Sequence, residues 1–226
     1  ALARAMIDAG ADWRGWHIFA GSQNLDPLAI IETQAATIAL AARLSDAVGM
    51  APPLVNLGGG FGLAYFPGDM ALDIRPIGVA LDSVLESLPD ILGDSKFAIE
   101  LGRWLVGEAG VYLTRVIDVK VSQGETFVVV DGGLHHQLAA SGNFGTVVRR
   151  NYPIAIANRF TAPPADQAVT VVGCLCTPID RLGDKVALPP VVPGDLVAIF
   201  LAGAYGASAS PSAFLGHPAA RQLLLG

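Results

Sequence analysis

The stretch Ile99-Glu100-Leu101-Gly102-Arg103 decides how the rest of this 226-residue chain is interpreted. It includes the end of a short apolar run, Phe97-Ala98-Ile99, so a carboxylate and a guanidinium lie at the end of a predicted strand. Two opposite charges at this point could hold a ligand that carries both a cation and an anion. The alternative is an ordinary ion pair, worth about 0–1 kcal/mol when it is exposed. These five residues alone favour the ion pair, whereas the neighbouring motifs favour a ligand site.

Residues 1–100 alternate helix-like and strand-like segments. We expect helices over 1–10, 28–48 and about 74–88, and strands over 16–19, 53–57 and 97–99. Asp26-Pro27 predicts the start of the second helix and Gly49 predicts its end. This alternation is typical of an α/β barrel or a doubly wound sheet, in which ligand-binding groups collect at the carboxyl ends of the strands.

Candidate binding residues follow each of the three predicted strands. They are His17 and Ser22, then Gly58-Gly59-Gly60-Phe61-Gly62, and then Glu100 and Arg103. Glycines let the backbone approach a ligand closely and direct several N–H groups at one anion. The glycine loop has neither the P-loop lysine nor the dinucleotide-binding spacing. Taken singly, a lone histidine is more often a buried hydrogen-bonded residue, Ser22 a turn cap and the loop a flexible connection, but their shared position favours a ligand site.

After Arg103 the pattern predicts an antiparallel β domain. A hairpin over 111–122 and 125–131 is followed by a polar loop over 135–151 and by strands over 154–160, 169–176 and 196–201. Cys174 and Cys176 lie two positions apart on a predicted strand, so a disulfide between them would be strained. The sequence has no zinc-type spacing of cysteine and histidine, and we expect no metal.

The composition excludes some classes of protein. The chain is 52% hydrophobic and 15% charged, with a net charge of −6, which argues against nucleic-acid binding. The longest apolar run, residues 196–207, contains two glycines and is shorter than the roughly 20 residues of a membrane-spanning helix. The start lacks the apolar region of a signal peptide. We therefore expect a cytoplasmic protein with no membrane partner.

Taken together, the motifs resemble the fold type III, pyridoxal-phosphate-dependent decarboxylases of ornithine, arginine, lysine and diaminopimelate. The motifs, in chain order, are His17-Ile18-Phe19-Ala20-Gly21-Ser22-Gln23, Gly58-Gly59-Gly60-Phe61-Gly62, Glu100-Leu101-Gly102-Arg103, Asp131-Gly132-Gly133, Gly173-Cys174-Leu175-Cys176-Thr177-Pro178-Ile179-Asp180 and Gly203-Ala204-Tyr205-Gly206. Cys-Thr-Pro-Ile-Asp and the ending over 208–218 resemble the bacterial subgroup associated with exosortase and exopolysaccharide loci.

The resemblance implies a fold and a division of the chain. Residues 1–108 would form the C-terminal part of an alanine-racemase-like TIM barrel that binds pyridoxal phosphate. Residues 109–204 would form the antiparallel β domain, and residues 205–226 would return to the barrel. The protein would be a homodimer with shared active sites, and its small-molecule substrate would be an amino acid that is free or tethered to a carrier.

The resemblance also assigns roles to single residues. His17 would stack on the pyridine ring, and Glu100 would keep the ring nitrogen protonated so that the ring accepts electrons. The phosphate would be held by Ser22, Gly59, Gly60, Arg103 and Tyr205. Cys176 would give a proton across the dimer interface after carbon dioxide departs. Asp180, Arg149 and Arg150 would lie near the distal end of the substrate.

Three departures from the family pattern bear on this interpretation. Leu101 replaces the usual proline of Glu-Pro-Gly-Arg, and Thr177 replaces an acidic residue, which puts the usual diamino acids in doubt. The family's Schiff-base lysine lies upstream of the histidine motif, and the lysines here are Lys96, Lys120 and Lys185. We expect all three to be solvated surface residues, and we expect this chain to be the C-terminal portion of the enzyme, inactive alone.

Two alternatives remain open. A racemase of the same fold is one, and Cys176 in place of the racemase tyrosine counts against it. A non-catalytic binding or regulatory protein that keeps the fold is the other. The missing lysine favours this second alternative, whereas the retained ring and phosphate motifs count against it.

Overall fold

The computed structural model describes residues 1–144, 149–165 and 167–226, which form two compact units. The first, called the α/β unit, comprises Ala1–Ala64 and Asp69–Trp104, and the second, called the β unit, comprises Tyr65–Gly68 and Leu105–Gly226. Part of the loop expected over 135–151 lies outside the described residues. The two units are described separately.

The α/β unit is a three-stranded parallel sheet with helices. Strands β1 (Trp16–His17), β2 (Leu54–Asn56) and β3 (Lys96–Ala98) pair in that order. The helices are α1 (Leu2–Asp8), α2 (Pro27–Val48), α3 (Arg75–Leu85) and the 3₁₀ turn η1 (Asp90–Leu92). Helix α4 (Arg103–Val106) begins in this unit, and its last two residues belong to the β unit. This order confirms the predicted alternation, with strands that are shorter than expected.

Both ends of α2 follow from its sequence. The Asp26 carboxylate accepts a hydrogen bond of 2.9 Å from the N–H of Leu28, and Pro27 occupies the first turn, where no N–H is needed. Gly49 ends the helix in the left-handed conformation at φ 74°. The predicted start and stop of this helix are confirmed.

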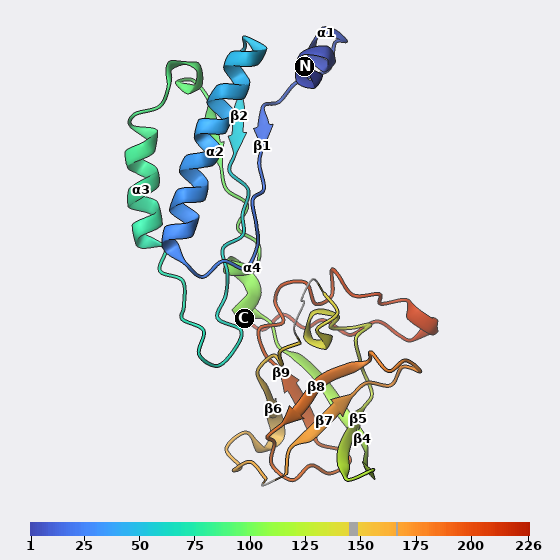
Figure 1. The fold of residues 1–226 in the computed structure, drawn as a ribbon. Coiled ribbons are helices and arrows are strands. Elements are labelled where there is room, and N and C mark those ends of the chain that lie inside the picture. Colours follow the sequence, from blue (N-terminus) through green and yellow to red (C-terminus); the bar gives the residue numbers. More distant parts are fainter. Residues whose placement is uncertain (145–148, 166) are drawn as a thin grey trace. The chain divides into compact units, whose positions relative to one another are not determined.

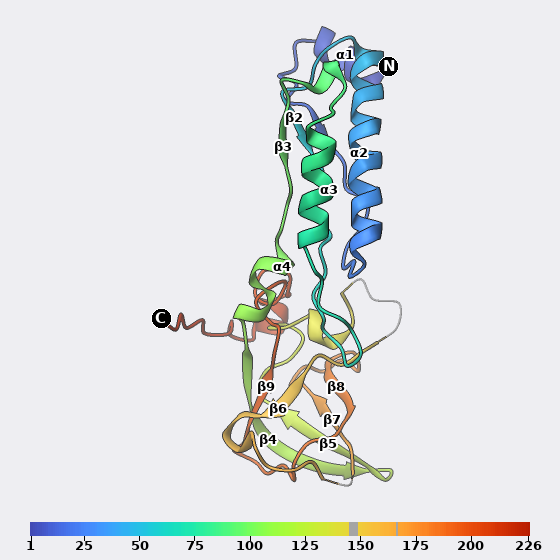
Figure 2. The same cartoon turned by 90° about the vertical axis from the view of Figure 1, so that its left-hand side faces the viewer.

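The strand register gives the sheet two different faces. Trp16, Val55 and Phe97 are paired neighbours and pack with Ile38 and Ala41 of α2 in one apolar core. Helices α2 and α3 lie side by side (Figures 1 and 2). Because side chains alternate along a strand, the next residues in register, His17, Asn56 and Ala98, belong to the opposite face.

The β unit is a six-stranded, curled sheet in the order β6-β9-β4-β5-β7-β8 (Figure 1). Its strands are β4 (Tyr112–Ser122), β5 (Glu125–Val130), β6 (Ile154–Ile156), β7 (Val169–Val172), β8 (Arg181–Val186) and β9 (Leu196–Ile199). Short 3₁₀ turns are η2 (Gly107–Ala109), η3 (Ala139–Ser141), η4 (Ala157–Arg159) and η5 (Phe214–Gly216). Val128, Val171, Leu182 and Ile199, all fully buried, lie in the core of this unit.

The structure corrects the expected antiparallel sheet in three respects. Strand β5 pairs with β7 in parallel, because the long connection between them lets the chain return in the same direction. Strand β8 was not predicted, since Gly183, Asp184 and Lys185 disfavour strands, and its pairing with β7 is irregular. Strand β7 ends at Val172, so Cys174 and Cys176 lie in bends after the strand and not on it.

Helix α2 is long and apolar enough to cross a bilayer, by length and composition alone. Its polar residues interrupt the apolar ones, so the sequence shows no long uninterrupted apolar run there. Its Ile38, Ala41 and Ala42 are buried against the sheet in the core of the α/β unit. The helix therefore has the packing of a core helix, and composition alone is weak grounds for a membrane span.

Candidate functional site

The ends of the three parallel strands bring His17 and Glu100 together. His17 Nε2 lies 3.2 Å from Glu100 Oε2, and the two side chains are 55% and 56% exposed. Asn56 Nδ2 donates a hydrogen bond of 2.9 Å to the other carboxylate oxygen, Oε1. Asn56 was missed in the sequence, although a polar residue near the end of a predicted strand, two positions before Gly58, was a usable signal. The prediction that His17 and Glu100 lie at one edge of the sheet is confirmed, and the alternative of a buried His17 is wrong.

The glycine loop is bound into the same edge. The N–H of Glu100 donates to the carbonyl of Gly58 at 2.8 Å, and the N–H of Gly58 donates to Asn56 Oδ1 at 2.9 Å. A Cβ on Gly59 would lie 2.1 Å from the Glu100 carbonyl oxygen. Gly60, at φ +93°, has no space for one either, since it would lie 2.2 Å from the carbonyl oxygen of Gly21. The loop therefore requires glycine for close packing and for its backbone conformation.

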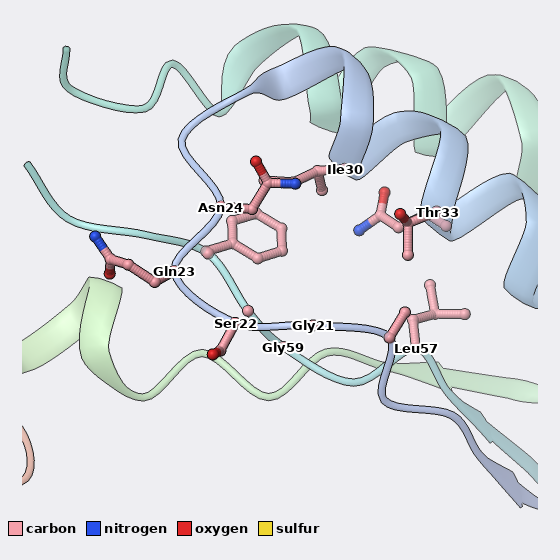
Figure 3. A pocket seen from close by; sticks show the side chains of 12 residues that line it. Gly21, Ser22, Gln23, Asn24, Ile30, Thr33, Leu57 and Gly59 are labelled. Carbon is pink, nitrogen blue, oxygen red and sulfur yellow. The ribbon is translucent and has the colours of Figure 1, made fainter. Parts of the chain in front are cut away.

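A cavity of about 340 Å³ lies beside this loop (Figure 3). It is lined by Ala20, Gly21, Ser22, Gln23, Asn24, Ile30, Thr33, Gln34, Leu57, Gly59, Gly60 and Phe61. Gln34 is only 5% exposed, and its Oε1 has no hydrogen-bond partner within the described residues. A buried amide oxygen without a partner is unusual, and Gln34 Oε1 is therefore able to accept a hydrogen bond from a polar group in this cavity. Sequence reasoning missed Gln34, because one glutamine in a helix carries no signal.

Arg103 is positioned by Gln23. Its Nη1 donates to Gln23 Oε1 at 3.0 Å, and the same oxygen accepts the N–H of Leu63 at 3.2 Å. Gln23 also donates to the carbonyl of Leu63. Gln23 thus joins the histidine motif, of which it is the last residue, to Leu63, which follows the glycine loop, and to Arg103 of the Glu100 motif. The sequence assigned no role to Gln23.

Tyr205 belongs to the β unit. Its ring packs on Phe144 with a centroid distance of 5.3 Å, and its φ of 58° is unusual for a tyrosine. Its contact with a phosphate stays a prediction.

The predicted catalytic and substrate residues of the β unit differ in exposure. Cys176 is exposed on the bend between β7 and β8. Asp180 is only 3% exposed, and its oxygens accept the N–H groups of Leu134 at 2.6 Å and Leu175 at 2.9 Å. Burial raises the pKa of the Asp180 carboxyl, although these two hydrogen bonds oppose the shift. Asp180 therefore joins two loops, and its contact with a substrate stays a prediction.

The two predicted substrate arginines have partners within the β unit. Arg149 donates to the carbonyl of Arg181, and burial lowers the pKa of its guanidinium. Arg150 is exposed, and its guanidinium carbon lies 3.9 Å from the ring centroid of Phe66. Their roles toward a substrate also stay predictions.

The three lysines are exposed, as expected. Lys120 lies in β4, as predicted for the hairpin. Lys96 is the first residue of β3, one position before the predicted strand over 97–99, and Lys185 lies in β8, a strand that was not predicted.

The chemistry of the strand-end groups fits pyridoxal phosphate. A carboxylate suits a protonated ring nitrogen, an imidazole suits the face of the ring, and glycine N–H groups with an arginine suit a phosphate. His17, Glu100, Gly59, Gly60 and Arg103 provide these groups within the α/β unit.

Comparison with known proteins agrees with this chemistry. Residues 11–203 match the family model described as pyridoxal-dependent decarboxylase, C-terminal sheet domain. The chain is 43% identical over 213 residues to an L-glutamyl-[BtrI acyl-carrier protein] decarboxylase of Niallia circulans, covering 93% of this chain and 50% of that protein. It is 33% identical to a diaminopimelate decarboxylase of Archaeoglobus fulgidus, covering 93% and 48%.

Solved structures give the same result. The diaminopimelate decarboxylase of Helicobacter pylori, complexed with L-lysine, matches with a TM-score of 0.69 and 29% identity, covering 88% of this chain and 45% of that one. The structure of AQ1208 from Aquifex aeolicus matches with a TM-score of 0.77 and 27% identity, covering 91% and 48%. The chain spans about half the length of the relatives it matches. With most of its residues matched by the family model, the chain belongs to the pyridoxal-dependent decarboxylases of the ornithine, diaminopimelate and arginine type.

Proposed function

We propose that this chain serves a pyridoxal-phosphate-dependent decarboxylase of an amino acid, as the part that binds the cofactor's ring nitrogen and phosphate and supplies a proton donor. The observation that carries the proposal is the group formed by His17, Asn56 and Glu100, which is open to solvent at the strand ends beside a loop that requires glycine. An exposed ion pair of this kind contributes little to folding, so its arrangement is better explained by a ligand.

Pyridoxal phosphate, when bound, accepts the electron pair that remains when a carboxylate leaves as carbon dioxide. Glu100 would hold a proton on the ring nitrogen, because an ionised carboxylate favours a neighbouring cation. Asn56 holds Glu100 in place through its 2.9 Å hydrogen bond, and His17 would cover one face of the ring. Gly59, Gly60, Ser22 and Arg103 would donate hydrogen bonds to the phosphate.

Cys176 is proposed as the proton donor to the carbon that loses carbon dioxide. It is exposed on its bend, whereas Cys174 is partly buried. Tyr205 is proposed as a further phosphate donor, and Asp180, Arg149 and Arg150 as groups near the distal end of the substrate. The enzyme is proposed to be a cytoplasmic homodimer with shared active sites, of the exosortase-associated subgroup.

The substrate class is proposed to be a monoamino acid, free or tethered to a carrier. Thr177 stands where diamino-acid enzymes of the family carry an acidic residue, which would remove a partner for a distal ammonium group. The relative from Niallia circulans, 43% identical, is named for glutamate attached to an acyl-carrier protein. A carrier-tethered acid has no distal ammonium, so the two observations agree.

The test measures carbon dioxide release by the protein that carries these residues, with free amino acids and with glutamate on an acyl-carrier protein. Glu100→Gln is expected to retain the cofactor and to lose at least tenfold in rate, about 1.4 kcal/mol of transition-state stabilisation. Glu86→Gln, an exposed residue after α3, is the matched control and is expected to keep the rate. Turnover of Glu100→Gln within a few-fold of the original would assign the role to another residue.

The exposed positions of the three lysines favour a second candidate, a binding or regulatory protein without catalysis. Borohydride treatment with pyridoxal phosphate, followed by peptide mass mapping, distinguishes the two. We expect no stoichiometric adduct on Lys96, Lys120 or Lys185, and an adduct on a lysine outside residues 1–226 in an active protein. Cofactor binding with neither adduct nor turnover would favour the non-catalytic protein.

A further inference from the structure

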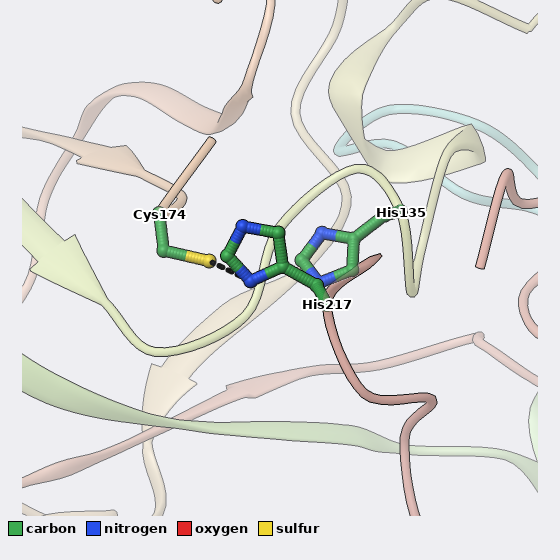
Figure 4. Close-up of side chains that lie close together, drawn as sticks. All are labelled: His135, Cys174 and His217. Carbon is green, nitrogen blue, oxygen red and sulfur yellow. Dashed lines mark hydrogen bonds between the residues drawn. The ribbon is translucent and has the colours of Figure 1, made fainter. Parts of the chain in front are cut away.

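Three side chains that are far apart in the sequence meet inside the β unit (Figure 4). His135 lies after β5, Cys174 lies after β7, and His217 follows η5 near the end of the chain. One ligand atom from each lies within 4.8 Å of the other two, and Cys174 Sγ lies 3.9 Å from His217 Nδ1. The separations of 39 and 43 residues explain why no spacing in the sequence showed this cluster.

His135 is the member of the cluster that most needs a partner. It is 0% exposed, and neither ring nitrogen has a hydrogen-bond partner within residues 1–144, 149–165 and 167–226. Leaving a buried polar group unsatisfied costs about 1–3 kcal/mol, so an unpaired buried imidazole requires an explanation. Burial, with His136 and His217 nearby, lowers the pKa of His135 to about 4.

The neighbouring His136 is not counted as a fourth ligand, because both of its ring nitrogens already have hydrogen-bond partners. His136 Nδ1 lies 3.1 Å from the Tyr112 hydroxyl, and its Nε2 lies 2.8 Å from the carbonyl oxygen of Pro218. The Cys174 thiol donates to the carbonyl oxygen of Asp131 at 3.6 Å, and its Sγ contacts His217 Nδ1 at 3.9 Å. These contacts leave both ring nitrogens of the buried His135 without a partner among the described residues.

We propose that His135, Cys174 and His217 bind a divalent cation of the zinc type, with a fourth position open to water or a small anion. Two imidazoles and a thiolate form a ligand set that zinc favours, and three protein ligands with one open position are typical of accessible zinc sites. Ligand lengths of about 2.1 Å for nitrogen and 2.3 Å for sulfur place N and S about 3.6 Å apart in a tetrahedron. The observed 3.9 Å between Cys174 Sγ and His217 Nδ1 needs a small contraction, and the pairs that include His135, which lie within 4.8 Å, would have to close as well.

The thiol is the group that must change on binding. Burial and the neighbouring Asp180 and Asp131 carboxylates raise the pKa of the Cys174 thiol. A bound zinc ion deprotonates a coordinating thiol, and the proton leaves to solvent.

The site would link three segments of the β unit. The metal would tie the residues that follow β5 and β7 to the C-terminal segment. One hydrogen bond already holds that segment, because the N–H of Leu138 donates to Ser210 Oγ at 2.8 Å. A metal at this point would hold that segment against the sheet. The proposal concerns residues of the β unit alone and does not depend on the proposed decarboxylase function.

The experiment uses the full chain without an affinity tag, kept reduced and stripped with a chelator. Zinc chloride is titrated against a chromophoric competitor, and cobalt(II) chloride is added separately to observe the thiolate-to-cobalt charge-transfer band. We expect one metal ion per chain and a visible band. Cys174→Ser should weaken zinc binding at least about tenfold and abolish the band, whereas Cys176→Ser, the matched control, should change neither.

If Cys174→Ser does not fold, His217→Gln still tests the proposal. His217 lies in a segment without regular structure, so replacing its side chain should not prevent the chain from folding. This variant should weaken zinc binding by a similar factor and leave the far-ultraviolet dichroism of the sheet unchanged. Equal weakening by Cys174→Ser and Cys176→Ser, or zinc affinity unchanged in both Cys174→Ser and His217→Gln, would overturn the proposal.

Discussion

The two units use polar side chains in opposite ways. In the α/β unit, His17 and Glu100 pair at 3.2 Å with more than half of each side chain exposed. In the β unit, Asp180 and Asp195 are only 3% and 4% exposed, and backbone N–H groups donate to both. Exposed pairs add little to stability and stay available to a ligand, whereas a buried carboxylate must be fully bonded. The comparison separates residues that hold the fold from residues that can act on a ligand.

The largest effect should come from Asp195 in the β unit, a buried carboxylate whose partner Arg159 is 34% exposed. Asp195 bonds Arg159, Asn158 and the N–H of Val192. Asp195→Ala leaves these donors without an acceptor, and each buried donor left unsatisfied costs about 1–3 kcal/mol. Water can solvate the 34% exposed Arg159, so the loss comes mainly from the buried donors. Urea unfolding of the full chain measures this loss of free energy.

The matched control is the more exposed pair of Arg181 and Asp184 in the same unit, whose side chains are 39% and 36% exposed. Asp184→Ala should cost under about 1 kcal/mol. Similar losses from both substitutions would contradict the distinction between buried and exposed carboxylates.

The glycine loop of the α/β unit should give the next largest effect. Gly59→Ala places a Cβ 2.1 Å from the Glu100 carbonyl oxygen, so the loop or the strand end must move. Such overpacking costs about 1–3 kcal/mol and should also displace Glu100 from Asn56. Gly102→Ala, which meets nothing within 4 Å, should be near neutral. Equal stabilities of the two variants in thermal unfolding would show that the loop is not closely packed.

Acid should produce a smaller loss through Asp195. Burial alone would raise the pKa of this carboxyl, but the N–H of Val192, Asn158 and Arg159 together hold it below its ordinary 3.8. The unfolded chain then takes up a proton at a higher pH than the folded chain does. The stabilisation is present above pH 3.8 and is lost as the pH falls below it.

Asp195→Asn tests this dependence because an amide does not titrate. Its free energy of unfolding, measured in urea at several pH values, should fall less steeply below pH 3.8 than that of the original chain. A steeper fall in the variant would mean that Asp195 does not contribute through its charge.

The sequence predicted the elements whose signals are local. The capping of α2 by Asp26, its end at Gly49 and the hairpin of β4 and β5 depend on near neighbours. Strand β8 and the parallel pairing of β5 with β7 depend on partners far along the chain, which outweigh the poor strand propensity of Gly183 and Lys185.

The same distinction holds for the candidate site. His17, the glycine loop and Glu100 were predicted because each ends a strand, and parallel strands bring such ends to one edge. Asn56 was missed because it lies inside the predicted strand over 53–57, whereas the observed strand β2 ends at Asn56. The cluster of His135, Cys174 and His217 was missed because nothing local relates three residues on separate loops.

The smallest effect on stability should come from Glu100→Gln, the substitution that is expected to have a large effect on turnover. Glutamine keeps an oxygen to accept the Asn56 hydrogen bond and loses only the charge facing His17. Because this pair is more than half exposed, water replaces the lost attraction, and the free energy of unfolding should change by less than about 0.5 kcal/mol. The measurement is urea unfolding at pH 7, with Glu86→Gln as the control. The dependence of the unfolding free energy on urea concentration must be the same in the variants and the original chain, so that their free energies can be compared. A loss above about 1 kcal/mol would show that Glu100 supports the fold as Asp195 does, and the contrast between the two units would then not identify the residues that act on a ligand.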